Sequence, residues 1–405
     1  MEHTPHSPHG ESQGFYGLVI APNLLTAIEK LGFKTPTPIQ HQAIPIAVAG
    51  KDVVGIAQTG TGKTLAFGVP MLQQIAQTGG RGLIILPTRE LAVQVDEMLH
   101  QIGRSFGLRT ALLIGGASSE RQRQALQRQP QIIIGTPGRI NDHLAQGTLR
   151  LGDVRILVLD EADRMLDMGF APQIRKILQT VPKQRQTMLF SATMPKEIMR
   201  LATSYMQLPI RVEIAPEGTA AETVEQELFV VTKDQKLRLL DKLLQQYGGP
   251  VLIFSRTKFG ARKIARAIGT MGHPVADLHS NKSFSQRQAA LAGFKSGKYR
   301  ILVATDIASR GIDVAGIELV VNYDVPENPH DYIHRIGRTG RAGLTGRAIT
   351  FASADQGQQV RDIQKLMRTL IPITQLPALP PPRSDNFPAL SYKSVKPRRH
   401  PSYRR

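Results

Sequence analysis

The sequence predicts an α/β protein with two successive domains, each built on a parallel β-sheet, between two disordered ends. Three observations predict this fold. The chain has 405 residues, which is too long for one ordinary domain. Short apolar runs alternate with segments whose apolar residues recur at three- and four-residue spacing, which is typical of buried strands between helices. The alternation stops once, at residues 213–222, and then resumes.

These patterns give each part of the chain its expected bounds. We expect a disordered N-terminus at 1–14, a first domain at 15–212, a linker at 213–222, a second domain at 223–370 and a basic disordered tail at 371–405. Strands are expected at 52–56, 82–86, 131–134, 155–159 and 187–190, and then at 250–254, 300–304, 318–321 and 348–351. Helices are expected at 90–106, 172–180, 236–247, 258–271 and 358–369.

The composition favours a polyanionic partner. The chain has 51 Lys and Arg against 32 Asp and Glu, a net charge of +19. Such an excess is typical first of nucleic-acid binding and second of binding to anionic membranes, although it also serves plain solubility. No apolar run approaches the roughly 20 residues of a membrane span, and the polar N-terminus is no signal peptide. The absence of cysteine excludes disulfides and fits a cytoplasmic location.

A phosphate-binding loop follows the first expected strand. Residues 57–64 read AQTGTGKT, and a helix is expected after them. Gly60 and Gly62 allow backbone N–H groups to surround a phosphate at a helix N-terminus. Lys63 is expected to reach the β- and γ-phosphates and Thr64 to ligate Mg²⁺. The alternative is a tight glycine turn beside a surface lysine.

An acidic pair ends a buried strand about a hundred residues later. Asp160 and Glu161 follow the apolar run 155–159, and the carboxyl ends of such strands carry ligand chemistry in open α/β sheets. Asp160 is expected to hold Mg²⁺, partly through water, and Glu161 to orient or deprotonate the attacking water. The alternative is a solvated cluster of loop acids.

The second domain contains a candidate cation for the transferred phosphoryl group. The run 334–341 reads HRIGRTGR and spaces three arginines three residues apart, on one side of a helix and its following loop. We expect Arg338 and Arg341 to stabilise the transition state, because a guanidinium matches phosphate geometry and the first domain shows no such finger. By itself this basic stretch would be a solvated helix face.

At this point the motifs resemble one family. Residues 160–163 spell DEAD, and the flanking runs agree with the DEAD-box ATP-dependent RNA helicases in identity, order and spacing over roughly residues 15–370. These runs are 32–40 with the upstream Phe15, then 87–91, 115–116, 136–139 and 191–193, and, in the second domain, 254–256, 304–313 and 334–341. Among bacterial members the runs 278–283 and 304–313 most resemble the RhlE branch.

The resemblance implies two RecA-like domains that bind ATP with Mg²⁺ and hold RNA by its backbone, without base readout. It implies that Gln40 reads the adenine edge, that Phe33 packs on the base, and that Asp313 lies near the ribose. The implied ATP contacts are Phe15, Phe33, Gln40, Gln58, Thr59, Gly60, Thr61, Gly62, Lys63, Thr64 and Asp313. The implied RNA contacts are Pro87, Thr88, Arg89, Gly115, Gly116, Thr136, Pro137, Gly138, Arg139, Arg256 and Thr305. Ser191, Ala192 and Thr193 would couple hydrolysis to RNA separation.

The expected activity is RNA-stimulated hydrolysis of ATP to ADP and phosphate, by a monomer that unwinds short duplexes or remodels RNA–protein complexes. Two alternatives stay open: an ATP-dependent RNA clamp or chaperone, and a related motor that acts on DNA. One departure from the family bears on them. Ser280 and Phe284 stand where the family often has Gly and Gln, although Arg287 keeps its place. The tail 376–405 has seven basic residues and one acid, a net charge of +6, and is either an RNA tether or a solubility segment.

Overall fold

The computed structural model of the chain describes residues 14–58, 60–104, 107–214, 224–306, 314, 316–340 and 345–380. Three of the expected site residues, Thr59, Asp313 and Arg341, lie outside these described residues. So do most of the expected linker, residues 1–13 and the tail beyond residue 380.

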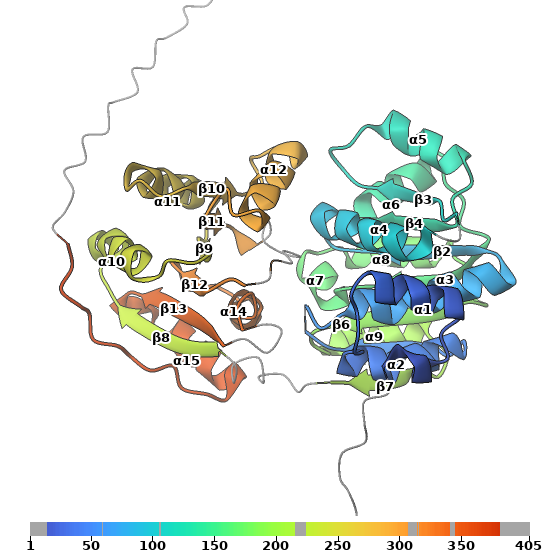
Figure 1. Cartoon of the computed structure of the whole chain (residues 1–405), viewed down its shortest axis with the longest axis horizontal. Helices are drawn as coiled ribbons and strands as arrows, with labels where there is room; N and C mark the ends of the chain where they lie inside the picture. The colour runs from blue at the N-terminus through green and yellow to red at the C-terminus, as the bar shows by residue number, and fades with distance from the viewer. Residues whose placement is uncertain are drawn as a thin grey trace, which may run out of the picture.

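The first domain is built on a seven-stranded sheet in the order β3-β4-β2-β5-β6-β1-β7, with parallel pairing throughout. Successive strand residues point to opposite faces, so that Val53 joins one core cluster and Val54 the other. Helices α1 to α4 pack in the first cluster and α5 to α9 in the second. Figure 1 shows this domain on the right. The strands are β1 Val53–Ile56, β2 Arg81–Ile85, β3 Thr110–Leu113, β4 Ile132–Gly135, β5 Val154–Leu159, β6 Gln186–Ser191 and β7 Ile210–Glu213.

The helices of the first domain are α1 Pro22–Lys30, α2 Pro38–Val48, α3 Lys63–Thr78, α4 Arg89–Gly103, α5 Ser119–Gln127, α6 Pro137–Ala145, α7 Ala162–Asp167, α8 Ala171–Leu178 and α9 Lys196–Tyr205, after a 3-10 turn at Phe15–Leu18. Several of them begin directly at a strand end, so that the loops between them gather at the carboxyl edge of the sheet.

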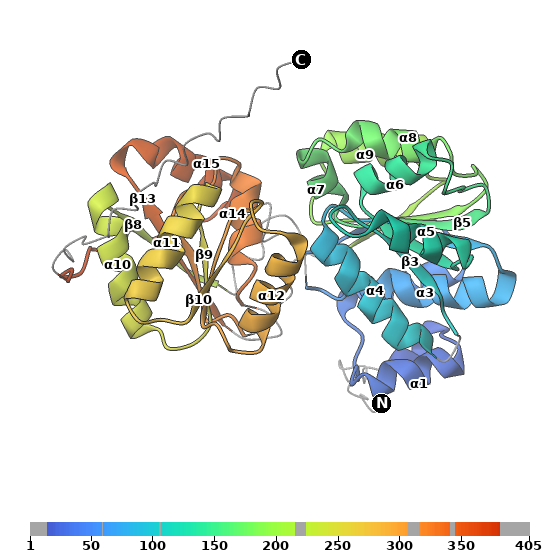
Figure 2. The same cartoon turned by 90° about the horizontal axis from the view of Figure 1, so that it is seen from above.

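The second domain is built on a six-stranded parallel sheet in the order β10-β11-β9-β12-β13-β8. Helices α10 and α11 pack in the core cluster on one face, and α12, α14 and α15 pack in the cluster on the other (Figures 1 and 2). The strands are β8 Val224–Val230, β9 Val251–Phe254, β10 Val275–Leu278, β11 Ile301–Ala304, β12 Leu319–Asn322 and β13 Gly346–Ala352. The helices are α10 Lys233–Gln246, α11 Lys258–Thr270, α12 Phe284–Lys295, α14 Pro329–Ile336 and α15 Gly357–Met367, with a 3-10 turn at Ala354–Gln356.

The expected fold class is confirmed, and every expected strand is found within about two residues of its place. Four strands were not expected: β3, β7, β8 and β10. All four are edge strands of their sheets. An edge strand has one open side and fewer covered residues; in β7 only Val212 is buried. Such strands lack the continuous apolar run that identifies an interior parallel strand.

The beginning of the expected tail is packed against the second domain, which corrects the prediction of disorder from residue 371. We call residues 371–380 the C-terminal strap. Leu376 and Leu379 pack on the core cluster beneath α10, and Ile373 forms a parallel bridge with Leu228. Arg238 Nε donates to the Pro380 carbonyl at 2.6 Å, and Lys242 Nζ donates to the Ala378 carbonyl at 2.9 Å. In Figure 1 the strap runs as an extended segment beside α10.

The Pro-rich composition of the strap explains this arrangement. Proline holds the backbone extended and has no N–H to satisfy, so carbonyl groups remain as acceptors for the basic residues of α10.

Among the described residues, no helix is both long enough and apolar enough to cross a bilayer.

Candidate active site and nucleic-acid interface

The phosphate-binding loop has the expected form. It connects β1 to α3, and Gly60 and Gly62 adopt φ values of 89° and 88°, which favour glycine. Gly62 is the N-cap of α3, so the first N–H groups of a 16-residue helix face the loop. Lys63 is buried; its Nζ donates to the Ala57 carbonyl at 3.0 Å and lies 4.0 Å from Asp160 Oδ1. The loop therefore presents backbone donors and one cation to an anion.

The side chain of Gln40 is hydrogen-bonded to this loop. Its Nε2 donates to the Gly62 carbonyl at 3.0 Å, and its Oε1 accepts from Thr37 N at 2.9 Å as part of a capping box at the start of α2. Phe33 is half-buried against the core cluster of α1 to α4. Phe15 is 3% exposed within that cluster. Phe15 is therefore part of this core, and its contact with ATP stays a prediction.

Two buried acids follow the end of β5, and the first of them, Asp160, faces Lys63. Asp160 and Glu161 are each 3% exposed, and Glu161 holds φ 51°, a conformation that non-glycine residues rarely adopt. Burial raises the pKa of Asp160 to about 6; the charge of Lys63 opposes this rise and that of Glu161 adds to it. Arg164, on α7, donates from Nη1 to Glu161 Oε2 at 3.2 Å, and both side chains are buried. The carboxylate expected to activate water is thus held in place by an arginine.

The run 191–193 is bonded to the acidic tetrad. Asp163 Oδ2 accepts from Ala192 N at 3.1 Å, from Thr193 N at 2.9 Å and from Thr193 Oγ1 at 3.0 Å. In return, Asp163 N donates to Ser191 Oγ at 3.2 Å. The end of β6 is therefore joined to α7 by hydrogen bonds.

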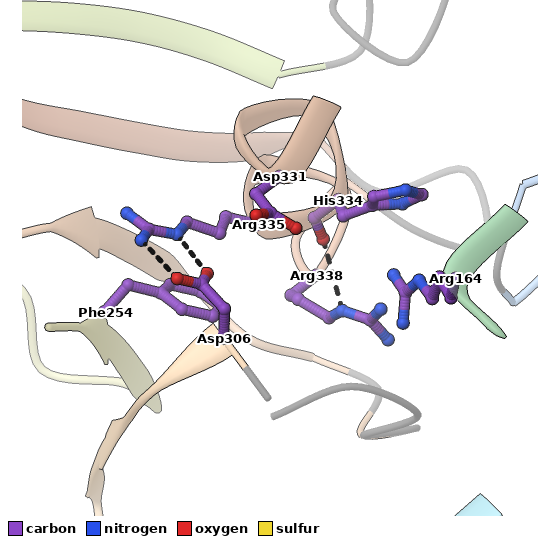
Figure 3. A pocket seen from close by; sticks show the side chains of 7 residues that line it. All are labelled: Arg164, Phe254, Asp306, Asp331, His334, Arg335 and Arg338. Carbon is purple, nitrogen blue, oxygen red and sulfur yellow. Dashed lines mark hydrogen bonds and ion pairs between the residues drawn. The ribbon is translucent and has the colours of Figure 1, made fainter. Parts of the chain in front are cut away.

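A small cavity is lined by six second-domain residues and by Arg164 of the first domain (Figure 3). It is lined by Arg164, Phe254, Asp306, Asp331, His334, Arg335 and Arg338. Arg335 forms a two-point ion pair with Asp306, at 2.5 and 2.7 Å, and its guanidinium lies 5.1 Å from the centre of the Phe254 ring. Arg338 is 3% exposed, and its Nε donates to the His334 carbonyl at 3.2 Å. The structure thus places Arg338 beside Arg164, the arginine that is paired with Glu161.

A cleft of about 400 Å³ contains most of the expected RNA-contacting residues. Its first-domain wall includes Pro87, Thr88, Arg89, Gly115, Thr136, Gly138 and Arg139, and also Glu90, Asp142, Met168 and Phe170. Ser280 and Arg287 line it from the second domain. We call this cleft the groove. Four of the expected residues do not line it: Gly116 and Pro137, which are next to lining residues, and Arg256 and Thr305, which lie after the ends of β9 and β11.

Comparison with known proteins decides the family. Residues 37–201 match the model of the DEAD/DEAH box helicase family, and residues 235–343 match that of the helicase conserved C-terminal domain. The DEAD-box ATP-dependent RNA helicase CshA of Geobacillus kaustophilus is 43% identical over 87% of this chain and 76% of its own length. CshA of Bacillus subtilis is 42% identical over 87% and 72%. The chain belongs to the DEAD-box ATP-dependent RNA helicases.

Solved structures agree with the fold of this helicase. S. cerevisiae Dbp5 bound to RNA and ADP BeF3 superposes with a TM-score of 0.81 at 31% identity, over 90% of this chain and 96% of that one. Mss116p bound to ssRNA and AMP-PNP gives a TM-score of 0.83 at 26% identity, over 93% and 82%. Two RecA-like domains are therefore confirmed.

Within the helicase groove, the Gly115–Gly116 pair makes room for Arg89. A Cβ on Gly115 would lie 2.9 Å from the Arg89 guanidinium, and one on Gly116 would lie 2.3 Å from it. Gly116 also holds φ 75°. Burial, with the charges of Arg287 and Arg139, lowers the pKa of Arg89. This crowding of cations is suited to a polyanion.

The two domains of the helicase meet inside the groove. Arg287 Nε lies 2.7 Å from Glu90 Oε1, and both side chains are largely buried. Phe284, at the start of α12, packs against the first-domain core next to Gly116. Phe284, which stands where the family often has Gln, therefore lies at the interface between the two domains. The ion pair between Arg287 and Glu90 lies in the same interface.

The donors near the phosphate loop suit Mg²⁺. The described residues contain no group of three or more His, Asp or Glu side chains able to cage a metal. Thr64 and Asp160 instead offer one hydroxyl and one carboxylate at the phosphate loop. Mg²⁺ takes few protein ligands and is completed by water and substrate phosphates, so this sparse set of oxygen donors fits it.

Sequence reasoning missed Arg164, Arg335 and Asp306 at the nucleotide side and Glu90 in the groove. Arg164 follows the run 160–163 and the other three lie within expected runs, but membership of a motif does not show which charges will pair. Arg335 belongs to the same run as Arg338, yet its bonds to Asp306 hold it within the second domain.

Proposed function

We propose that this helicase hydrolyses ATP between its two domains and uses the closure of those domains to separate short RNA duplexes. One observation supports this most directly: both candidate clefts contain residues of both domains. Arg164 lies with Arg338 at the nucleotide side, and Arg89 lies with Arg287 in the groove. A change in the relative position of the two domains would therefore alter both clefts.

At the nucleotide side, the backbone of 60–62 and Lys63 bind the phosphates, and Gln40 and Phe33 receive the adenine once Gln40 leaves the Gly62 carbonyl. Thr64 and Asp160 hold Mg²⁺, which neutralises phosphate charge when bound. Glu161 orients the attacking water and takes its proton. Arg338 and Arg341 place positive charge against the departing phosphoryl group.

The link to RNA runs through Asp163. Because this carboxylate holds Ala192 and Thr193 at 2.9–3.1 Å, displacement of α7 on hydrolysis moves the end of β6. Asp160, in the same tetrad, also donates its N–H to the Ile85 carbonyl at the end of β2, two residues before Pro87. Hydrolysis at the acids is thereby connected to the wall of the groove.

In the groove, Arg89, Arg139 and the loop at Thr136 bind backbone phosphates and sugars, without reading bases. Arg256 and Thr305 extend this contact on the second domain.

The helicase acts as a monomer in this proposal. The relatives compared above carry the name CshA, so assignment to the RhlE branch rests only on the runs 278–283 and 304–313. A cytoplasmic location stays a prediction.

The test compares nucleic acids. We expect RNA to stimulate ATP hydrolysis strongly and DNA of the same sequence and length to do so weakly. A short RNA duplex should separate with ATP and not with a non-hydrolysable analogue under single-cycle conditions. Equal stimulation by DNA would indicate a DNA motor, and tight ATP-dependent RNA binding without strand separation would indicate a clamp.

A further inference from the structure

The positive charge of the chain is concentrated at one edge of the second domain. Residues 256–300 contain ten Lys and Arg residues and a single acid, Asp277, so this segment has a net charge of +9 out of the total of +19. Asp277 is itself paired with Lys282 and His279. The segment comprises α11, the edge strand β10 and α12, with the helices on opposite faces of the sheet. Its remaining bases have no acid of their own nearby in sequence.

Helix α11 presents these bases in a regular row. Its apolar residues Ala261, Ile264 and Ile268 pack inward. Lys258, Arg262 and Arg266 follow at four-residue spacing on the outer side, with Lys263 beside them. Within the part of the chain that the structure describes, none of these four residues forms an ion pair, and α11 contains no acid. By contrast, α10 and α15 carry acids among their bases.

An exposed aromatic ring lies among these cations. Phe259 is 68% exposed, and Lys258 Nζ lies 5.4 Å from its ring centre. Large apolar side chains on a surface helix are normally turned inward, as Ile264 is here. An exposed ring between bases is the arrangement that stacks on an unpaired nucleobase while the cations bind the flanking phosphates.

The start of α11 lies at the same edge of the second-domain sheet as the groove. Helix α11 begins two residues after Arg256, at the carboxyl end of β9. At the same edge of the sheet, Ser280 follows β10 and lines the groove, and Arg287 lines it from α12. Figure 2 shows α11 and α12 on either side of β10, with α12 toward the first domain. An RNA strand that leaves the groove past β9 meets α11 next.

We propose that α11 is a second RNA-binding surface, which holds the single strand beyond the groove by its phosphates and by stacking on Phe259. This inference rests on the proposed function, because it takes the groove as the main RNA site. A helix of 13 residues is about 20 Å long, which spans several phosphates of a strand. The surface lengthens the RNA footprint and adds no base specificity.

The test measures RNA affinity across a salt series, with a non-hydrolysable ATP analogue present and with two single strands. A strand of about six nucleotides fills the groove, and one of about twenty extends past it. For the long strand, Arg262→Gln/Arg266→Gln should flatten the slope of log affinity against log salt by about 1.4, since each lost phosphate contact contributes about 0.7. Phe259→Ala should weaken long-strand binding roughly 5-fold or more and leave the slope unchanged. Neither variant should change binding of the short strand.

The matched control is Arg361→Gln/Lys365→Gln, another exposed basic pair at four-residue spacing in the same domain, on α15. This control should bind both strands as the wild type does. Lines that coincide with the wild type for the α11 pair would overturn the proposal, and would leave the surface to some other partner. Equal losses in the control pair would also overturn it, because charge alone would then be responsible. Failure of the proposed function itself would appear separately, as absence of ATPase stimulation by the short strand in the wild type.

Discussion

Asp160 is a buried carboxylate beside the phosphate loop, and burial of its charge lowers the stability of the nucleotide-free protein. The pKa of Asp160 is raised to about 6, so the folded state binds this proton more tightly than the unfolded state does. The stability that protonation provides is complete at low pH and is lost as pH rises through about 6. At neutral pH the charged side chain is kept for function rather than for stability.

Asp160→Asn should therefore stabilise the nucleotide-free protein while abolishing hydrolysis. The amide resembles the protonated acid, and we expect the free energy of unfolding of the first domain to rise by roughly 2–3 kcal/mol at pH 8. About half of this gain should remain at pH 5. Urea denaturation at the two pH values measures it. Equal stability of variant and wild type at pH 8 would show that burial of the charged carboxylate does not destabilise the folded protein.

Glu161 should be needed for turnover and not for binding. Glu161→Gln keeps the shape of the side chain and removes its ability to accept a proton, so we expect kcat to fall by roughly 10²–10⁴. Affinities for an ATP analogue and for RNA should change no more than a few-fold, as fluorescence titration can measure. A kcat within a few-fold of wild type would remove Glu161 from its assigned role.

Among single residues, the sequence motifs predicted which types meet at the site but not how each is held. Lys63 and Asp160 lie 4.0 Å apart, and Arg338 lies beside Arg164. The bond of Gln40 to Gly62 and the burial of Phe15 depend on how α2 and the first turn pack, which no local pattern specifies. The pairing of Glu90 with Arg287 joins residues 197 positions apart and needs the placement of both domains.

Among elements, the interior strands were predictable and the edge strands were not. Interior parallel strands are covered on both faces and read as continuous apolar runs. The four edge strands mix buried positions with half-buried or exposed ones, and their place is set by the neighbouring strand rather than by their own sequence. The C-terminal strap escaped prediction for a similar reason, because proline-rich composition alone is typical of disorder.

The strap should contribute to the stability of the second domain. Leu376→Ala/Leu379→Ala removes the half-buried side chains that pack beneath α10, and we expect a loss of about 1–2 kcal/mol in the free energy of unfolding. Thermal or urea unfolding of the full chain measures it. Ile373→Thr is the control, because Ile373 is exposed and its replacement should cost little. A double variant as stable as the control would mean that the strap rests on the domain without supporting it.

At the scale of the whole molecule, each cleft is incomplete in one domain. The first domain supplies the phosphate loop, the acids and most of the groove, and the second supplies Arg338 opposite Arg164 and Arg287 opposite Glu90. We therefore expect binding of nucleotide to need only the first domain. We expect hydrolysis and its stimulation by RNA to need both.

The most direct measurement is the ATPase rate, with and without RNA, of three proteins: the full chain, the full chain with Arg338→Ala, and the isolated first domain, residues 1–214. We predict that all three bind an ATP analogue with similar affinity. We predict that RNA stimulates only the wild-type full chain, and that Arg338→Ala lowers its stimulated rate by roughly 10³-fold or more. An isolated first domain that hydrolyses ATP at the RNA-stimulated rate of the full chain would contradict hydrolysis between the two domains.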